Sequence, residues 1–204
     1  MKKIFKLNLI ILALFFAQTL VFAIFNDILV VDIQYDWINK AEVEKEAIIQ
    51  EVHDIIFKNG ALTKKDDLKT QFSEKLKDKN YKENYLAASA GYKEYKDNNI
   101  SAFYYKKQKH IYMYALQDKK DLSKSFYYDA LGKLRYVDFN SGEYPEYPYY
   151  KIQYSISGEP ISAIYNVSKD NQYLYEPDGT FKGVWYKHNL YDKHSKVILK
   201  RTTF

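Results

Sequence analysis

The sequence contains no cysteine and little glycine or proline. The absence of cysteine from all 204 residues excludes disulfide bonds, thiolate nucleophiles, zinc–thiolate sites and iron–sulfur clusters. Seven glycines and four prolines are too few for a collagen-like or linker-dominated chain. Hydrophobic residues make up 47% of the chain and charged residues 28%, which predicts a folded protein with one ordinary domain or two small ones.

Signatures of the common catalytic and nucleotide-binding families are also absent. The sequence holds no Gly-x-Ser-x-Gly, His-Glu-x-x-His, Ser-x-x-Lys, Walker-type or Gly-x-Gly-x-x-Gly motif. These absences exclude only the families that carry those motifs. We therefore predict no cofactor, and a hydrolase with a site assembled from scattered His, Asp and Glu residues stays open as an alternative.

The beginning of the chain has the pattern of an export signal. Three lysines within the first six residues precede an apolar run over residues 7–25. Val21 and Ala23 occupy the small-residue positions that signal peptidase needs for cleavage after Ala23, so we predict a signal peptide over residues 1–23. The run also approaches the roughly 20 residues that cross a bilayer, so an uncleaved anchor to about residue 31 is the alternative.

Export changes the meaning of the net charge. The formal charge of +5 includes the three lysines of the predicted signal, which leaves +2 for residues 24–204. Nucleic-acid binding needs a clustered basic surface, so we predict no nucleic-acid partner. With its positive charges at the very front, either version of the N-terminus places the rest of the chain outside the cytoplasm, in the periplasm or the extracellular space.

Residues 36–98 have helical periodicity. A first helix is predicted over Trp37–Lys58, with Ile48, Val52 and Ile55 on its buried stripe and the following Gly60 in the left-handed conformation that ends helices.

Two further helices are predicted before residue 98. One begins at Thr63, with Asp66 at the capping-box position. The other follows the series Tyr81, Tyr85, Ala88, Tyr92 and Tyr95, with steps of four and three residues, which places Gly91 inside a helix. On that interpretation Gly91→Ala stabilises the protein by about 0.5–1 kcal/mol.

Residues 99–204 change to the alternation of strands. Each of three segments has an apolar or aromatic residue two positions before a tyrosine and a glycine four positions after it: Phe126–Gly132, Ile152–Gly158 and Tyr173–Gly179. The alternation predicts strands, and each glycine predicts a tight turn with positive φ. The most sensitive turn is predicted at Gly179, because Pro177 and Asp178 already fix it. The fold class is therefore α+β: a signal or anchor helix, a short helical region, and a C-terminal antiparallel β-meander.

The segment Phe181–Trp185, with the sequence Phe-Lys-Gly-Val-Trp, resembles the opening of a MORN repeat, a β-hairpin unit that starts aromatic-x-Gly-x-Trp. The wider pattern of a tyrosine, a glycine turn and Gly-Lys-Leu at Gly132 is similar to the MORN-variant repeats of bacterial proteins. The resemblance covers about residues 126–192, and His188 and Asp192 stand where later glycines of the unit would fall. It implies a stack of hairpins used for contact with a partner or a membrane surface rather than for catalysis.

Aromatic side chains provide the candidate ligand contacts. The segment Glu143–Tyr150 holds two of the four prolines and four tyrosines, which predicts an extended loop. Tyr144, Tyr147 and Tyr149 on this loop, together with Trp185, are the predicted ligand-contact residues. Such rings either stack on a ligand or fold back over the sheet as a lid.

The best candidate for a metal or an acid–base pair is the group His188, Asp192 and His194. Two imidazoles and a carboxylate are suitable zinc ligands and can also act as acid and base. The spacing is loose, however, and it is typical of a solvated turn between the last two strands. We therefore predict no metal, with these three residues as the weak candidates.

The sequence predicts an exported, non-catalytic binding or structural protein of the cell envelope or the extracellular space. An envelope glycan, a lipid headgroup or a protein is the expected partner, and the mixture of aromatic and basic residues over Tyr104–Tyr114 suits the first two. An anchored protein whose helices contact a membrane partner is a third possibility. A deep pocket that gathers two or more His, Asp or Glu residues would favour the hydrolase, whereas a flat aromatic sheet face would favour the binding protein.

Overall fold

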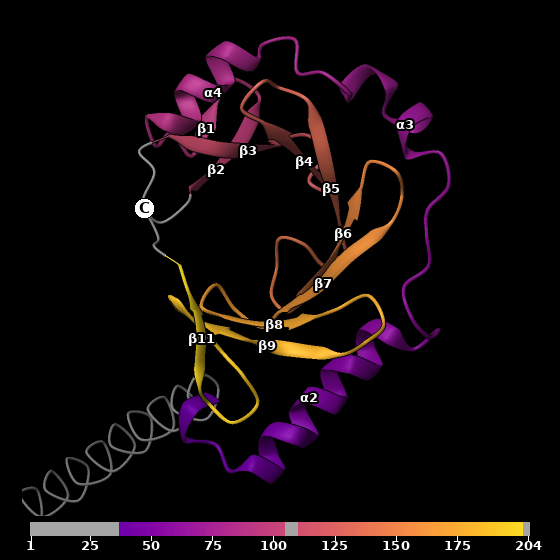
Figure 1. Cartoon of the computed structure of the whole chain (residues 1–204), viewed down its shortest axis with the longest axis vertical. Helices are drawn as coiled ribbons and strands as arrows, with labels where there is room; N and C mark the ends of the chain where they lie inside the picture. The colour runs from indigo at the N-terminus through magenta and orange to yellow at the C-terminus, as the bar shows by residue number, and fades with distance from the viewer. Residues whose placement is uncertain (1–36, 105–109, 202–204) are drawn as a thin grey trace, which may run out of the picture. The chain divides into compact units, whose positions relative to one another are not determined.

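The computed structural model of the chain describes residues 37–104 and 110–201 (Figure 1). The chain divides into two compact units, residues 1–40 and 41–204. Of the first unit only residues 37–40 are described, with the short 3-10 helix η1 (Trp37–Asn39). The predicted signal or anchor segment lies outside the described residues. No helix within the described ranges is long and apolar enough to span a membrane.

The second unit is built on one antiparallel sheet. Within the described residues the sheet has eleven strands, and each strand pairs with the next one along the chain. The strands are β1 (Glu94–Tyr95), β2 (Asn98–Tyr104), β3 (Ile111–Asp118), β4 (Lys124–Asp129), β5 (Leu134–Asn140), β6 (Tyr149–Ser155), β7 (Pro160–Asn166), β8 (Asn171–Tyr175), β9 (Phe181–Tyr186), β10 (Asn189–Tyr191) and β11 (Val197–Lys200). The predicted α+β class with an antiparallel meander is confirmed.

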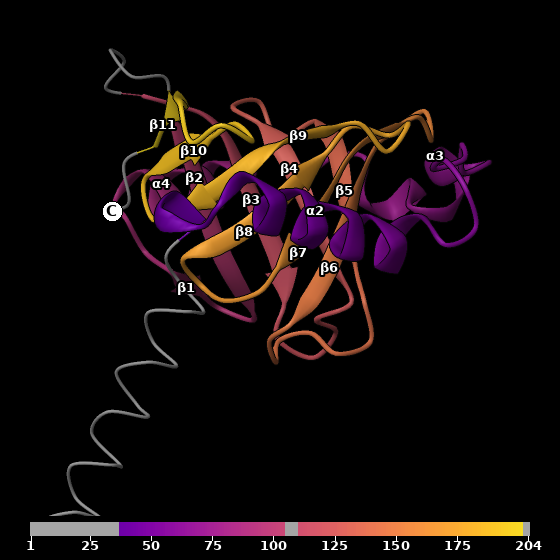
Figure 2. The same ribbon diagram turned by 90° about the horizontal axis from the view of Figure 1, so that it is seen from below.

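The first helix of this unit is α2 (Glu42–Phe57). It lies across β7 and β8 (Figure 2) and buries Val52, Ile56 and Phe57 against them, whereas Ile55 is 39% exposed. Val52 of the predicted stripe is buried as expected, and only the placement of Ile55 was wrong. The buried line also includes Lys45, whose ammonium donates to Ser195 Oγ at 2.6 Å, and a charged residue at that position was not expected to be buried.

The second predicted helix is shorter than expected and begins later. Its place is taken by α3 (Leu68–Gln71) and the 3-10 helix η2 (Ser73–Lys75). Residues 62–65 are not helical, so the capping box predicted for Thr63 and Asp66 does not form. The residue before α3 is Asp67, with φ of 61° and no capping hydrogen bond through its side chain. Extended chain before α3 runs along the sheet instead.

The third predicted helix, α4 (Tyr81–Ser89), ends earlier than expected. Gly91 has φ of 81°, its N–H donates to Ala88 O, and the N–H of Tyr92 donates to Ala87 O, both at 3.0 Å. These two bonds form the Schellman motif that closes a helix with a left-handed glycine. The prediction that Gly91 lies inside a helix was therefore wrong, and the residues after it enter β1 and start the sheet.

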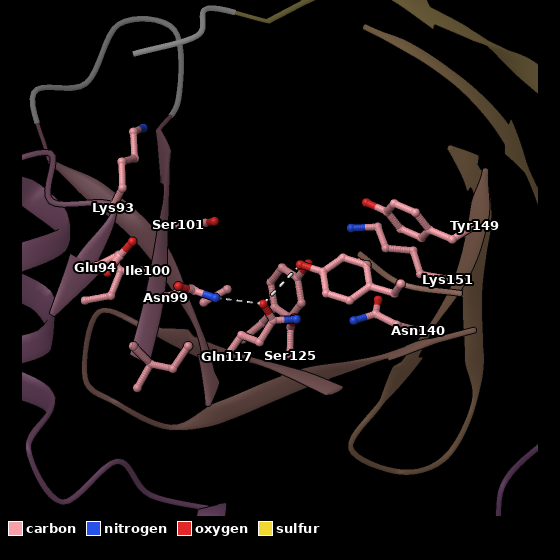
Figure 3. Close-up of a pocket in the computed structure, with 14 residues that line it drawn as sticks. Lys93, Glu94, Asn99, Ile100, Ser101, Gln117, Ser125, Asn140, Tyr149 and Lys151 are labelled. Atoms are coloured by element: carbon pink, nitrogen blue, oxygen red, sulfur yellow. Dashed lines mark hydrogen bonds between the residues drawn. The ribbon is translucent and has the colours of Figure 1, made fainter. Parts of the chain in front are cut away.

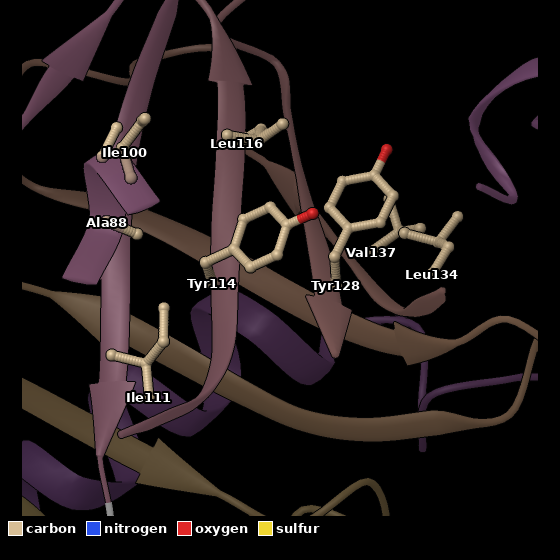
Figure 4. Packing of buried hydrophobic residues seen from close by; sticks show 9 residues of the cluster. Ala88, Ile100, Ile111, Tyr114, Leu116, Tyr128, Leu134 and Val137 are labelled. Carbon is tan, nitrogen blue, oxygen red and sulfur yellow. The ribbon is translucent and has the colours of Figure 1, made fainter. Parts of the chain in front are cut away.

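The helices cover the outside of the curled sheet (Figure 1), and the apolar core lies between them and it. Where α4 packs on the sheet, the core consists of Ala87 and Ala88 of the helix and the strand residues Ile100, Ile111, Tyr114, Leu116, Tyr128, Leu134 and Val137 (Figure 4). The rings of Tyr114 and Tyr128 stack at 5.6 Å between centroids. Below α2, Tyr175 donates its hydroxyl to Ile49 O at 2.8 Å. Tyrosine serves this core because its ring packs as an apolar body while its hydroxyl finds a backbone or carboxylate partner.

The turn glycines of the repeated pattern hold the connection between α2 and α4, residues 58–80. Gly132, Gly158 and Gly179 have φ of 74°, 87° and 91°, which confirms the predicted turns. The turn carbonyls accept backbone N–H groups of the connection: Pro177 O from Leu62 at 2.9 Å, Gly158 O from Lys65 at 2.9 Å and Gly132 O from Asp78 at 2.8 Å. The repeated turn therefore binds the helical region at three points, in addition to reversing the chain.

Candidate functional site: a polar cavity on the inner face of the sheet

Alternate strand residues face the inside of the curled sheet, and most of them are polar. We call the surface that they make the inner face. The pairing register and the cavity described below assign to it, among others, Asn99, Ser101, Ala115, Gln117, Ser125, Tyr127, Asp138, Asn140, Tyr149, Lys151, Gln153, Asn166, Gln172 and Trp185, together with the apolar Ile164 and Leu174. Their chain neighbours, such as Val137 and Tyr128, lie in the core on the other side.

The inner face holds a cavity of about 390 Å³ (Figure 3). This volume is within the range of small-ligand sites. The lining residues are Lys93, Glu94, Asn99, Ile100, Ser101, Ala115, Leu116, Gln117, Ser125, Tyr127, Asn140, Tyr144, Tyr149 and Lys151. Most of them carry an amide, a hydroxyl or an aromatic ring, so the cavity is suited to a ligand that both donates and accepts hydrogen bonds.

A buried ion pair forms the wall of the cavity at β5 and β6. The Asp138 side chain is 1% exposed, and its carboxylate lies 3.0 Å from Lys151 Nζ. It also accepts hydrogen bonds from the Tyr127 hydroxyl and, at 2.8 Å, from Gln153 Nε2. Three donors satisfy this buried carboxylate, so the pair does not leave an uncompensated charge in the sheet.

The ionisable groups of this wall have pKa values far from neutrality. Burial opposes the charged form of Lys151, but the adjacent Asp138 outweighs it and raises the lysine pKa above its ordinary value. Burial raises the pKa of Tyr127 above its ordinary value and that of Tyr149 to about 12. At neutral pH the lysine is therefore protonated and both phenols are neutral, and none of the three exchanges a proton readily.

Several polar groups of the cavity have no partner within the described part of the chain. Gln117 Oε1 accepts from Asn99 Nδ2 at 3.2 Å, and Asn140 Nδ2 donates to Leu122 O at 2.7 Å. The hydroxyls of Ser101 and Ser125 and the side-chain oxygen of Asn140 have no protein partner among these residues, so they are free for water or a ligand. The sequence alternation predicts that these residues share one face, but it does not show that the face is hollow.

The tyrosine loop after β5 folds back over the inner face. Tyr144 and Tyr149 line the cavity, and the Tyr144 hydroxyl donates to Gln117 Oε1 at 3.1 Å. Their rings meet edge to face at 4.8 Å, and Tyr147 packs on Tyr149 at 5.3 Å. The three tyrosines predicted as ligand contacts thus form one cluster, and two of them lie in the cavity wall.

Trp185, the fourth predicted aromatic contact, lies on the inner face but outside the cavity. It is the cross-strand partner of Gln172. The Arg201 guanidinium lies 4.6 Å above its ring and donates to Gln172 Oε1 at 3.0 Å. Trp185 is therefore part of a separate polar and aromatic group on the same face.

The structure places Asp192 and His194 in the lining of one pocket with Glu46, but His188 is not part of it. His188 lies in the turn between β9 and β10, and the other two lie in the turn between β10 and β11. Asp192 accepts backbone N–H groups of that turn, and His194 Nδ1 lies 3.4 Å from Glu42 Oε2. Within residues 37–104 and 110–201, no group of three His, Cys, Asp or Glu residues is arranged to hold a metal ion.

Comparisons with known proteins find no match: no family model, curated protein or solved structure matches this chain. The resemblance to MORN-type hairpins stays a prediction.

The sequence analysis missed the residues that define the cavity, among them Gln117, Asp138 and Lys151. Their signal was the strict alternation in β5 and β6, where Asp138 and Asn140 flank Phe139, and Lys151 and Gln153 flank Ile152. The polar half of such strands commonly faces solvent in a single antiparallel sheet, so the alternation alone does not indicate a cavity. A buried Asp–Lys pair on that face shows that the strands curl around it.

Proposed function

We propose that this chain is an exported, non-catalytic binding protein of the cell envelope or the extracellular space, and that its cavity holds a hydroxyl-rich group of an envelope glycan. The unpartnered hydroxyl and amide groups next to three tyrosine rings are the observation that carries this proposal. Sugar hydroxyls donate and accept hydrogen bonds as amides and serine hydroxyls do. The apolar faces of sugar rings pack on aromatic side chains such as Tyr144 and Tyr149.

The cavity does not favour the hydrolase. Its carboxylates are Glu94, which is paired with Lys119, and Asp138 behind the wall, which accepts three hydrogen bonds. A glycoside hydrolase needs two carboxyl groups that flank one bond, one of them protonated. The described histidines lie outside the cavity. The groups present are suited to holding a ligand rather than to moving protons.

Calorimetric titration of the full chain, kept in mild detergent, tests the binding site. The probes are the disaccharides of N-acetylglucosamine and of glucose. We expect saturable binding of at least one probe, and loss of at least tenfold in affinity in Ser101→Trp, because Ser101 is exposed in the cavity and an indole there fills it. The matched control is Ser157→Trp, in the turn after β6, which leaves the affinity unchanged. Absence of binding, or equal loss in both variants, would refute the cavity as the binding site.

Export is tested separately by cell fractionation with intact-mass measurement. The lysine front and the Val-Phe-Ala site predict a mature chain that begins at Ile24, outside the cytoplasm. A full-length chain outside the cytoplasm would select the anchored version. A full-length chain in the cytoplasm would overturn the proposal of export.

A further inference from the structure

A second group of ligand-type residues lies on the inner face at a fixed distance from the cavity. The register pairs Tyr149 with Asn166, Asn166 with Gln172, and Gln172 with Trp185. These four residues therefore form one row across β6, β7, β8 and β9. Neighbouring strands lie about 4.8 Å apart, so the row extends about 14 Å from the cavity wall to Trp185.

The far end of the row is preorganised for polar contacts. The Arg201 guanidinium lies over the Trp185 ring, and it donates from its Nη1 to Gln172 Oε1 and from its Nε to Lys187 O, the latter at 3.1 Å. These are two of its five N–H donors, which leaves three for another partner. Among the described residues the Asp170 carboxylate acts on Arg201 electrostatically, but no carboxylate lies within 4 Å of its guanidinium. A guanidinium stacked on an indole and fixed by two neutral acceptors is a rigid donor surface next to an aromatic ring.

The middle of the row contains an unsatisfied donor. Asn166 is 1% exposed, and within the described part of the chain its Nδ2 has no hydrogen-bond partner. A buried amide donor without a partner costs about 1–3 kcal/mol, so such groups are rare. Its neighbours in the row, Tyr149 and Gln172, carry a phenol and an amide.

We propose that the ligand is a linear glycan of about three sugars or more, which extends from the cavity along this row to Trp185 and Arg201. The inference rests on the proposed function, since it assigns the length and course of the glycan bound there. A sugar ring with its linkage spans about one strand spacing of about 5 Å, so a row of three spacings accommodates about three rings beyond the cavity wall. The row has an aromatic ring at each end, Tyr149 and Trp185, and two amide side chains between them, Asn166 and Gln172.

A length series tests the inference. Calorimetric titration of the full chain uses oligomers of N-acetylglucosamine and of glucose, from the disaccharide to the hexasaccharide. We expect the affinity to rise at least tenfold from the disaccharide to the longer members and then to level off. An affinity that does not change with length, while the disaccharide binds, would overturn the inference and leave the proposed function intact. Absence of binding at every length would overturn both.

Variants at the far end separate this contact from general effects on the fold. Trp185→Ala and Arg201→Ala are expected to lower the affinity for the longest oligomer about tenfold and to leave that for the disaccharide unchanged within about twofold. Tyr186→Ala is the matched control, because it follows Trp185 and faces the opposite side of the sheet. If Trp185→Ala lowers the melting temperature, its loss of affinity cannot be assigned to the ligand contact, and the test then depends on Arg201→Ala. Equal loss for short and long oligomers in Arg201→Ala contradicts the assigned course.

Discussion

Asp78 and Asp138 are both buried carboxylates, yet they lie on opposite sides of the same sheet and have different partners. Asp78, on the helix side, accepts from Tyr114, Asn84 and the backbone N–H of Asn80 at 2.7–2.9 Å. Asp138, on the inner face, pairs with Lys151. The first carboxylate joins the helical connection to the sheet with neutral donors. The second keeps a lysine charged at the wall of an open cavity. The helix side therefore buries its carboxylate among neutral donors, whereas the inner face buries its carboxylate in an ion pair beside a cavity.

Among the variants that test this comparison, we expect Lys151→Met to lower the free energy of unfolding the most. The variant leaves Asp138 buried with no cation, and breaking a buried pair from one side costs about 3–5 kcal/mol. Urea unfolding of the full chain measures the loss. The double variant Lys151→Met, Asp138→Asn is the control, and we expect it to recover most of the stability because no buried charge remains. If the single and double variants are equally unstable, packing rather than charge maintains this wall.

The difference in unfolding free energy between the wild type and Lys151→Met depends on pH because the pKa of Lys151 is raised. A raised lysine pKa in the folded state contributes stability that is complete below the ordinary value of about 10.4 and is lost as pH rises through the folded value. The difference between the wild type and Lys151→Met is therefore expected to stay constant from about pH 6 to 9. It shrinks at strongly alkaline pH.

The second largest effect is expected on the helix side, from Gly158→Val. The added Cβ would lie 1.8 Å from Lys65 O, and φ at Gly158 is already 87°. We expect a loss of about 3 kcal/mol or more, measured by urea unfolding. Gly60→Val is the matched control, with φ of 91° but no atom within 4 Å of its Cβ, and it should cost only the backbone strain of about 1–2 kcal/mol. Equal losses at both positions would show that the contact with the connection contributes nothing.

The structure therefore predicts that Gly158→Val, and not Gly179→Val as expected from the sequence, is the most destabilising of the three turn substitutions. The closest atom to a Cβ at Gly179 is His53 Nε2 at 2.6 Å, and a side chain that is part exposed can move away. At Gly158 the obstacle is backbone of a segment that is bound on both sides of it.

The smallest effect is expected from Gly91→Ala, and its sign is opposite to the sequence-based expectation. Because Gly91 closes α4 with φ of 81°, alanine there should destabilise the protein by about 1 kcal/mol. Ser89→Ala, two residues earlier and inside the helix, is the control and should be neutral or slightly stabilising. Thermal unfolding of both variants measures the difference. A stabilising alanine at Gly91 would mean that the helix continues through it.

The sequence predicted the order of the elements and the sheet topology, because both depend on local patterns. Alternation together with a glycine at a constant offset marked β4, β6 and β8, and these turns were confirmed at Gly132, Gly158 and Gly179. Helix ends and faces were less predictable. The apolar spacing around Gly91 continued past the end of α4 because the same tyrosines also suit a strand.

The candidate site was only half predictable. Tyr144 and Tyr149 were recognisable because each lies next to a proline, and prolines among tyrosines predict a rigid aromatic loop. Asp138 and Lys151 were not, because a polar residue at every second position predicts a solvated face in a flat sheet and a cavity wall in a curled one. The curl depends on contacts between distant segments, such as Lys65 with Gly158, which no local pattern contains.

The three-point binding of residues 58–80 has a consequence for the order in which the protein assembles. Leu62 and Lys65 leave the ribosome, and any export channel, before the turns at Gly158 and Pro177 that accept their N–H groups. Until the last hairpins arrive, this segment has no acceptors except water, and the apolar side of α2 has no strand to cover it. The connection therefore gains these acceptors late in synthesis, and loss of β7 to β9 would remove the acceptor of Leu62 and the strands under α2, while the bond between Asp78 and Gly132 would remain.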